Sequence, residues 1–190
     1  MVIFQKGIYP EEFIKMHCVE NHDNPRIMAL APDETSAKAW TAFEIFNQGA
    51  YLVYAGQESG AFHTPSLFDI DKVDWASYDL QEWLKKLLLL KKRNVFKSGT
   101  QTFLVAKPAI QAVITDEKKC LYGIFNVRNW NQVIPTQLPD GQYTDLLSEE
   151  TFLVNKGIVT LQNKSALIFE VDPNIAYEPL RFPLLDFIIR

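Results

Sequence analysis

A chain of 190 residues is long enough to bury a substantial hydrophobic core, as one domain or as two small ones. Hydrophobic residues at 47% and charged residues at 22% are ordinary proportions for a soluble globular protein. The formal net charge of −4 argues against nucleic acid and against a membrane surface as partners, and no apolar run reaches the roughly 18 residues of a membrane span.

The first half of the chain alternates short apolar runs with helical patterns. Residues 15–20, Lys-Met-His-Cys-Val-Glu, fit a buried strand in which the histidine packs into the core. Asp33 is a suitable N-cap for a helix that Gly49 ends. Residues 50–55 then form a second near-continuous apolar strand. Apolar strands separated by a helix are typical of a parallel sheet covered by helices.

Polar residues follow both strands. Residues 20–26, Glu-Asn-His-Asp-Asn-Pro-Arg, place two carboxylates, an imidazole, amides and a guanidinium directly after the first strand. Residues 56–58, Gly-Gln-Glu, follow the second. Active sites of barrel enzymes lie at the C-terminal ends of the strands, so this pattern predicts one wall of a site. The alternative is a simple turn in which Asp23 and Asn24 cap their own backbone.

A long loop, roughly residues 57–78, comes next, and loops of this length are usually functional. His63 is expected to face either a substrate or solvent. Three acids, Asp69, Asp71 and Asp74, raise the question of calcium. Their spacing fits no complete calcium loop, so we interpret them as a solvated acidic loop.

The sequence pattern changes after the next helix, from alternating strands and helices to short strands separated by turns. That helix runs to about Arg93, with an expected capping box of Asp79 and Glu82 and with Trp83 in its apolar stripe. Short strands separated by turn signals are then expected at residues 101–106, 109–115, 121–127, 132–137, 143–147, 151–154, 157–161 and 166–171, and one last strand is expected at the C-terminus. Such regular spacing predicts an antiparallel sandwich or barrel. Trp130 lies in one of the turns, as an ordinary hairpin tip or as a surface for stacking a sugar.

The fold class is therefore α/β plus all-β. Two strands and two helices cannot close a (β/α)8 (TIM) barrel, which needs eight such units. We interpret residues 1–95 as the last two β/α units of such a barrel, and residues 96–190 as an antiparallel β-sandwich domain. The uncovered apolar faces of the barrel remnant predict either that residues 1–95 are partly rearranged or that these faces are buried against another copy of the chain.

The compartment is only weakly indicated. No signal peptide is visible at the start of the sequence, but the incomplete barrel makes residue 1 an unnatural start. Cys18 and Cys120 have no metal-type spacing and are expected to be buried, reduced thiols. Two unpaired cysteines favour a reducing, cytoplasmic compartment.

Two motifs resemble those of α-amylase-type glycoside hydrolases. Residues 19–26, Val-Glu-Asn-His-Asp-Asn-Pro-Arg, resemble the family's fourth motif, at the end of barrel strand seven. Residues 49–58, Gly-Ala-Tyr-Leu-Val-Tyr-Ala-Gly-Gln-Glu, resemble its strand-eight motif, with Tyr51 where proline is common. Residues 67–75 look like the family's loop before helix eight, and residues 96–190 are similar to its C-terminal β-sandwich.

The resemblance implies a role for each residue of the first motif. Asp23 matches the family's third carboxylate, which holds sugar hydroxyls and stabilises the oxocarbenium-like transition state. His22 matches the histidine that binds the same sugar, and Asn21, Arg26 and Glu20 are expected to bind or orient the substrate. Retaining glycosidases also need a nucleophile and an acid/base about 5–5.5 Å apart. In the family these two carboxylates lie on strands four and five, upstream of this sequence.

The resemblance thus implies the C-terminal part of a retaining glycosidase that acts on α-glucosidic bonds of starch, maltodextrin or a related oligosaccharide. The isolated chain is expected to be inactive and to hold no metal or cofactor. A calcium site is expected only in the missing part of the parent enzyme. The alternative is a non-catalytic amylase-like domain used for protein interaction or sugar binding. The intact Asn21, His22 and Asp23 weigh against that alternative. Direct binding of starch by the sandwich is disfavoured, because its strands show no row of aromatic residues.

Overall fold

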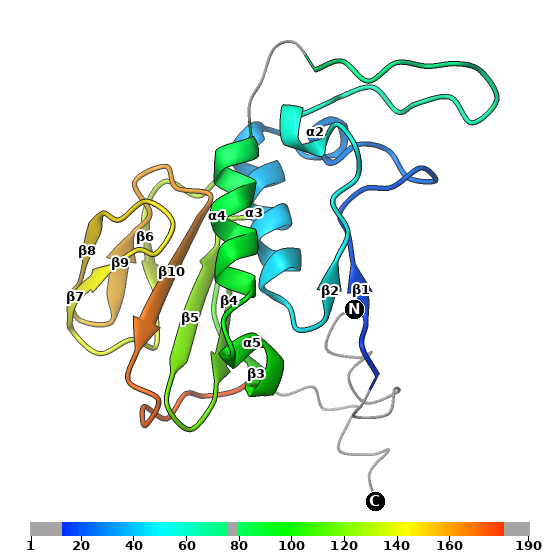
Figure 1. The fold of residues 1–190 in the computed structure, drawn as a ribbon. Helices are drawn as coiled ribbons and strands as arrows, with labels where there is room; N and C mark the ends of the chain where they lie inside the picture. The colour runs from blue at the N-terminus through cyan, green and yellow to red at the C-terminus, as the bar shows by residue number, and fades with distance from the viewer. Residues whose placement is uncertain (1–12, 76–79, 181–190) are drawn as a thin grey trace, which may run out of the picture.

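The computed structural model describes residues 13–75 and 80–180 (Figure 1). Asp79 and the residues of the expected last strand lie outside these ranges. Among the residues described, no helix is both long enough and apolar enough to cross a membrane. Both cysteines are free thiols; Cys120 is buried and Cys18 is half-buried.

Two short parallel strands and the helices that follow them form the β/α region, residues 13–75 and 80–91. Its elements are β1 (Met16–His17), α2 (Ile27–Leu30), α3 (Glu34–Phe46), β2 (Ala50–Tyr51), the 3-10 helix η1 (Gln57–Ser59) and α4 (Gln81–Lys91). The predicted parallel pairing is confirmed, with Met16 opposite Ala50. His17 is buried as predicted, and its Nδ1 lies 2.9 Å from Glu44 Oε2 on α3.

The cap predicted for α3 is confirmed, but its predicted end is wrong. The Asp33 carboxylate accepts a hydrogen bond of 2.8 Å from the Ser36 amide, and this bond lowers the pKa of Asp33. The helix ends at Phe46, before Gly49. Gly49 has a φ of +108°, and a Cβ there would lie 2.2 Å from the Lys15 carbonyl oxygen. A glycine is therefore needed at position 49 because the chain passes close to the Lys15 carbonyl next to β1, and not because the helix ends there.

The β-sheet region, residues 100–171, follows the short helix α5 (Val95–Ser98). Its strands are β3 (Thr100–Phe103), β4 (Ile110–Thr115), β5 (Cys120–Phe125), β6 (Val133–Pro135), β7 (Gly141–Thr144), β8 (Thr151–Val154), β9 (Ile158–Thr160) and β10 (Ala166–Val171). All pair antiparallel, as a four-stranded sheet in the order β10-β5-β4-β3 and as the pairs β6–β9 and β7–β8. The antiparallel prediction is confirmed, and the bounds of β8 and β10 agree with it.

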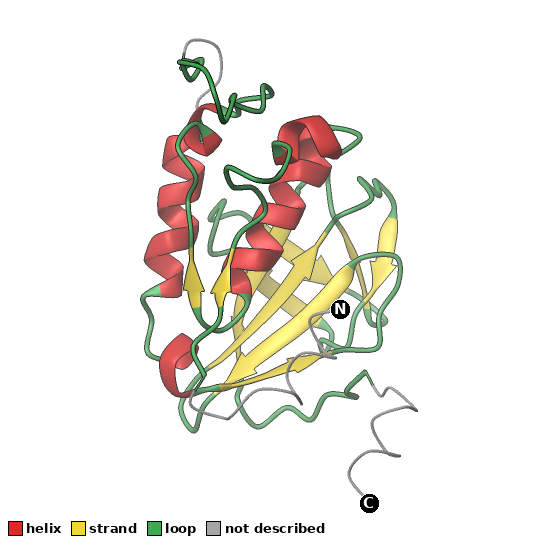
Figure 2. Ribbon diagram, turned by 90° about the vertical axis from the view of Figure 1, so that its right-hand side faces the viewer, coloured by secondary structure: helices red, strands yellow, loops and turns green. Residues whose placement is uncertain are grey.

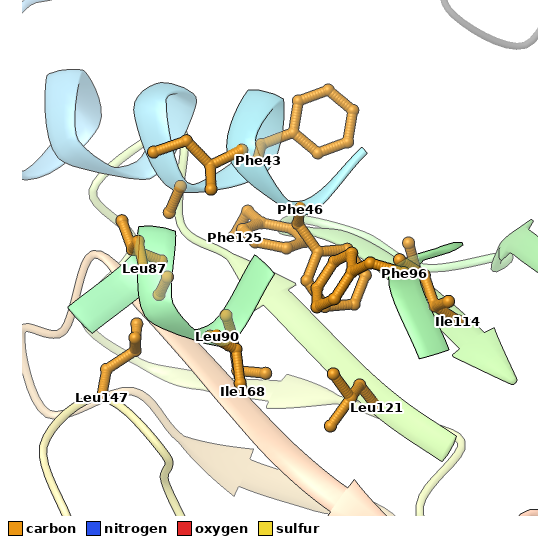
Figure 3. Packing of buried hydrophobic residues seen from close by; sticks show 14 of the residues in the cluster. Phe43, Phe46, Leu87, Leu90, Phe96, Ile114, Leu121, Phe125, Leu147 and Ile168 are labelled. Carbon is orange, nitrogen blue, oxygen red and sulfur yellow. The ribbon is translucent and has the colours of Figure 1, made fainter. Parts of the chain in front are cut away.

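The four-stranded sheet carries a hydrophobic core on each face. Along β5, Leu121 and Phe125 belong to the core shared with α3 and α4, whereas Tyr122 and Ile124 belong to the core shared with the two strand pairs. The ring centroids of Phe46 on α3 and Phe125 lie 5.2 Å apart (Figure 3). The helices thus lie between the large sheet and the β1–β2 pair (Figures 1 and 2).

The β1 segment is exposed on the side away from the helices. Phe13, Ile14 and Met16 are 52%, 76% and 61% exposed. Apolar side chains gathered in this way on a surface are unusual for a monomer, because burial in water-free packing stabilises them. Among the residues described, the sheet of the β/α region is therefore covered by α3 on one face, and Ile14 and Met16 are exposed on the other.

Candidate functional site

The turn after β1 presents His22 and Asp23 to solvent. The Asn21 side-chain oxygen accepts hydrogen bonds from the Asp23 amide at 2.9 Å and from the Asn24 side-chain amide at 2.8 Å. Asn21 thus caps the turn, in the manner typical of asparagine. Asp23 does not cap it: its Oδ2 lies 3.3 Å from His22 Nε2, and both side chains are about two-thirds exposed. The turn frees the Asp23 carboxylate for a ligand.

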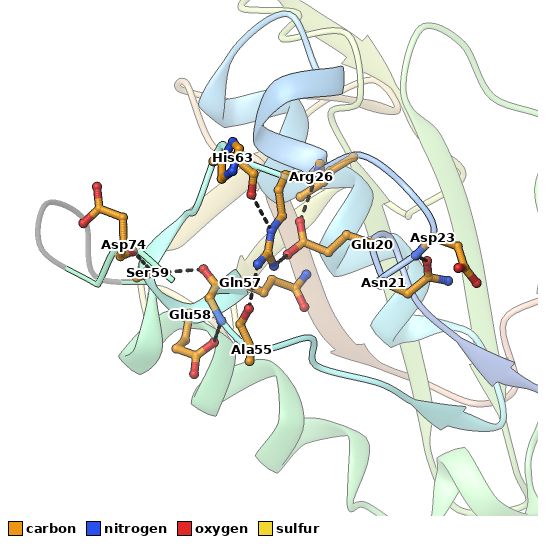
Figure 4. Close-up of polar contacts among 12 residues, drawn as sticks. Glu20, Asn21, Asp23, Arg26, Ala55, Gln57, Glu58, Ser59, His63 and Asp74 are labelled. Carbon is orange, nitrogen blue, oxygen red and sulfur yellow. Dashed lines mark hydrogen bonds and ion pairs between the residues drawn. The ribbon is translucent and has the colours of Figure 1, made fainter. Parts of the chain in front are cut away.

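Glu20 and Arg26, at either end of the motif, form a buried ion pair (Figure 4). Arg26 Nη1 donates to Glu20 Oε1 at 2.8 Å, and the second Glu20 oxygen accepts from the Ile27 amide at 2.8 Å. Both side chains are 1% exposed. A sugar cannot reach either charged group, so neither residue binds the substrate directly. The pair instead positions the turn that lies between them.

Arg26 also connects the ends of both strands with the long loop. Its Nη2 donates to the Ala55 carbonyl at 2.9 Å and its Nε to the His63 carbonyl at 3.2 Å. The guanidinium carbon lies 4.5 Å from the centroid of the Tyr54 ring. All the nitrogens of the guanidinium are thereby engaged, a condition that makes a buried charge tolerable.

The second motif supplies the backbone around this pair. Gly56 has a φ of +97°, and a Cβ there would lie 3.1 Å from Arg26 Nη2. Glu58 Oε2 accepts from the Gly56 amide at 3.0 Å, so Glu58 stabilises its own turn. Tyr51 replaces the family's proline without disturbing the sheet, because the amides of Ala50 and Leu52, and not that of Tyr51, donate to β1.

The long loop is held by side chains of its own. His63 Nε2 lies 2.7 Å from Asp71 Oδ2, and the same oxygen accepts from the Ser66 amide at 2.9 Å. These two bonds lower the pKa of Asp71, and the bond from the Ser66 amide has the larger effect. The His63 side chain is 72% exposed. Within residues 13–75 and 80–180, no three His, Cys, Asp or Glu side chains gather in a way that could hold a metal ion.

Two family models match the sequence. The model of the α-amylase catalytic domain matches residues 4–111, more than half of the chain. The chain belongs to the α-amylase family. The model of the bacterial α-amylase C-terminal domain matches residues 105–169. The fold is thus the end of an α-amylase catalytic barrel followed by the family's C-terminal β-sandwich domain.

Solved α-amylase structures share this fold. The enzyme from Lactobacillus plantarum is 25% identical with a TM-score of 0.82, over 90% of this chain and 41% of that chain. A maltogenic α-amylase from Thermotoga neapolitana is 20% identical with a TM-score of 0.69, over 95% and 44%. The α-amylase from Geobacillus thermoleovorans, complexed with acarbose, is 16% identical with a TM-score of 0.70, over 91% and 42%. The chain spans less than half the length of these proteins.

The structure brings Asn21, His22 and Asp23 together in one exposed turn, and separates them from the buried Glu20 and Arg26. Sequence reasoning did not find Tyr54 as the aromatic partner of Arg26. A tyrosine near the end of an apolar strand gives no signal of this contact, because Tyr54 follows β2 whereas Arg26 follows β1.

Proposed function

We propose that this chain is the C-terminal part of a retaining glycosidase that cleaves or transfers α-glucosidic bonds. The exposed pair of His22 and Asp23, at the end of a strand paired in parallel with β2, is the observation that carries the proposal. Family membership and the acarbose complex of the Geobacillus relative support it. The substrate class is starch, maltodextrin or a related oligosaccharide.

Asp23 would stabilise the transition state. Its carboxylate accepts hydrogen bonds from sugar hydroxyls, and such bonds strengthen as positive charge develops on the sugar ring. His22, 3.3 Å from that carboxylate, would bind the same sugar and orient Asp23. Glu20 and Arg26 hold the turn from within and do not touch the substrate.

The bond-breaking carboxylates belong to the upstream part of the parent enzyme. A nucleophile and an acid/base must stand about 5–5.5 Å apart across the scissile bond. The buried Glu20 is paired with Arg26, and Glu58 stabilises its own turn, so neither is available for this work. We therefore expect no hydrolysis by the 190-residue chain alone.

The test compares the chain alone with the chain preceded by its upstream coding region, using maltoheptaose and an assay for reducing ends. We expect turnover only in the longer protein. There, Asp23→Asn should lower kcat by about 10²–10³-fold, the typical loss for one electrostatic group. Glu117→Gln, an exposed carboxylate in the turn between β4 and β5, is the matched control and should retain full activity.

Two results would contradict the proposal. Turnover by the isolated chain that disappears in Asp23→Asn would mean that the chain holds its own nucleophile. An inactive longer protein without a carboxylate pair upstream would establish the non-catalytic alternative, a domain kept for sugar binding or protein interaction.

We also propose that the isolated chain associates with itself through the exposed face of the β1 segment. Ile14 and Met16 are 76% and 61% exposed there. Ile14→Lys combined with Met16→Lys should shift the chain from dimer or higher species towards monomer, measured by light scattering after gel filtration. Leu153→Lys, at a site 61% exposed on β8, is the control and should leave the association unchanged. A wild-type chain that is monomeric at all concentrations would contradict this proposal.

A further inference from the structure

A pocket of about 400 Å³ lies between the helices and the β-sheet region, in the size range of small-molecule sites, roughly 300–1,000 Å³. Its walls come from the first turns of α3, from Trp83 on α4, from the loop after β7 and from the turn before β10. It shares no residue with the motif at residues 20–26. The pocket is thus a candidate for a site of its own.

The lining holds two lysines, Lys38 and Lys164, and two carboxylates, Glu34 and Asp145, and each lysine has an acidic partner in the lining or beside it. Lys38 Nζ lies 3.5 Å from Glu34 Oε1, and Lys164 Nζ lies 2.6 Å from Glu150 Oε1. Asp145 is buried, and its oxygens accept from the Ser148 amide and hydroxyl and from the Ile168 amide. An ion of either sign would meet a like charge in this lining and would gain little.

The lining also combines an aromatic wall with hydrogen-bonding groups that a ligand can use. Trp83 is half-buried, and Lys38 Nζ lies 5.2 Å from the centroid of its ring. Asn163 is exposed in a turn with φ +61°, so its side-chain amide is accessible to a ligand in the pocket. An amide both donates and accepts, as do the hydroxyls of a sugar.

We propose that this pocket is a second carbohydrate site, which holds a short α-glucan through the Trp83 wall and through hydrogen bonds from Lys38 and Asn163. A neutral, polyhydroxylated ligand suits a lining whose charges cancel and whose polar groups include donors and acceptors. The choice of an α-glucan rests on the proposed function. The β-sheet region thus contributes to sugar binding together with the helices, although its own strands carry no aromatic row.

The experiment measures binding of maltoheptaose to the 190-residue chain by titration calorimetry. Asn163→Gly removes the amide and keeps a residue that tolerates positive φ, so binding should weaken about fivefold, the effect of one lost hydrogen bond. The matched control is Gln162→Gly, in the same turn with φ +50° but outside the pocket lining, and it should bind as the wild type does. In the Asp23→Asn background, which removes the carboxylate proposed to bind sugar at the turn after β1, Asn163→Gly should weaken binding by the same factor.

The outcomes separate this inference from the proposed function. Binding that is insensitive to Asn163→Gly but lost in Asp23→Asn would overturn the pocket and place the sugar at the turn after β1. No binding of maltoheptaose, or tighter binding of inorganic phosphate at the same residues, would likewise overturn it. None of these three results would affect the activity expected of the longer protein, because that activity is measured with the upstream region present.

Discussion

The two sheets of this molecule differ in how completely they are covered. In the four-stranded sheet, every residue of β5 is buried, since helices pack on one face and strand pairs on the other. In the β1–β2 pair, His17 is 6% exposed but the neighbouring Met16 is 61% exposed. Alternate residues of a strand point to opposite faces, so the contrast along β1 shows that, among the described residues, the face towards α3 is covered and the face of Met16 is exposed. A sheet of an α/β fold needs both faces covered to be stable alone.

The incomplete sheet nevertheless holds its candidate site in place. The ion pair of Glu20 and Arg26 connects the exits of β1 and β2 and the long loop through side-chain and backbone hydrogen bonds. The turn that carries Asp23 is closed by Asn21 within the same segment. Local polar contacts therefore position the site without the neighbouring strands of a closed barrel.

Removing a large side chain from the core between the helices and the large sheet tests whether the two regions depend on each other. Phe46 is 1% exposed and contacts the rings of Phe96 and Phe125. Phe46→Ala should lower the free energy of unfolding by about 3–5 kcal/mol. Because the core is shared, urea titrations followed by tryptophan fluorescence and by far-UV circular dichroism should move together.

The matched control is Leu153→Ala, whose side chain is 61% exposed on β8 and should cost no more than about 0.5 kcal/mol. Two separate transitions in Phe46→Ala, with the strand signal unchanged, would show that the β-sheet region is stable by itself.

Breaking the buried ion pair should have a large but local effect. Glu20→Gln keeps the shape of the side chain and leaves the Arg26 guanidinium buried without a counter-charge, at a cost of about 3 kcal/mol. Hydrogen exchange should accelerate at the Ile27 amide, which donates to Glu20, and not at the amides of β5. Glu82→Gln, in an exposed pair with Lys85, is the control and should change neither signal. Faster exchange throughout β5 would contradict a local role.

The sequence allowed most of the fold to be predicted because its signals are local. Apolar runs, the cap at Asp33 and the turn residues between strands each act within a few residues of their own position. The end of α3 was misplaced because a glycine near a helix end was interpreted as a cap. Gly49 is required instead by the Lys15 carbonyl, a contact across the sheet that no local pattern reveals.

The sequence allowed the segment that carries the site to be predicted, but not the side-chain contacts within it. The motif at residues 20–26 identified the segment, and the turn does expose His22 and Asp23. The spacing of Glu20 and Arg26 gave no sign that both point inward, because the partners of Arg26 at Ala55 and His63 come from another segment. The pocket beside Trp83 is beyond sequence reasoning for the same reason, since four separate segments line it.

Lys91, on α4 against the end of α3, carries a charge that opposes folding. Lys91 Nζ donates to the carbonyls of Ile45 and Asn47 at 2.8 and 2.5 Å, at the C-terminal end of α3. Burial lowers the pKa of Lys91 to about 8, against 10.5 for an ordinary lysine. Between these two pKa values the unfolded chain binds a proton that the folded chain does not, so stability rises with pH across this window.

The expected size of this effect is small. From about pH 7.5 to about pH 9.5, the free energy of unfolding of the wild type, relative to Lys91→Met, should rise by about 1 kcal/mol, since partial exposure screens the charge. Urea titrations at each pH give this difference, and taking it relative to the variant cancels other titrating groups.

Burial raises the pKa of Tyr122 to about 12, so stability should fall again above the ordinary tyrosine pKa of 10.0, and the measurements must stop below it. A difference that falls from pH 7.5 to pH 9.5 would show that the two carbonyl hydrogen bonds favour the charged form of Lys91 more than burial opposes it, and that the fold is stabilised by this charge.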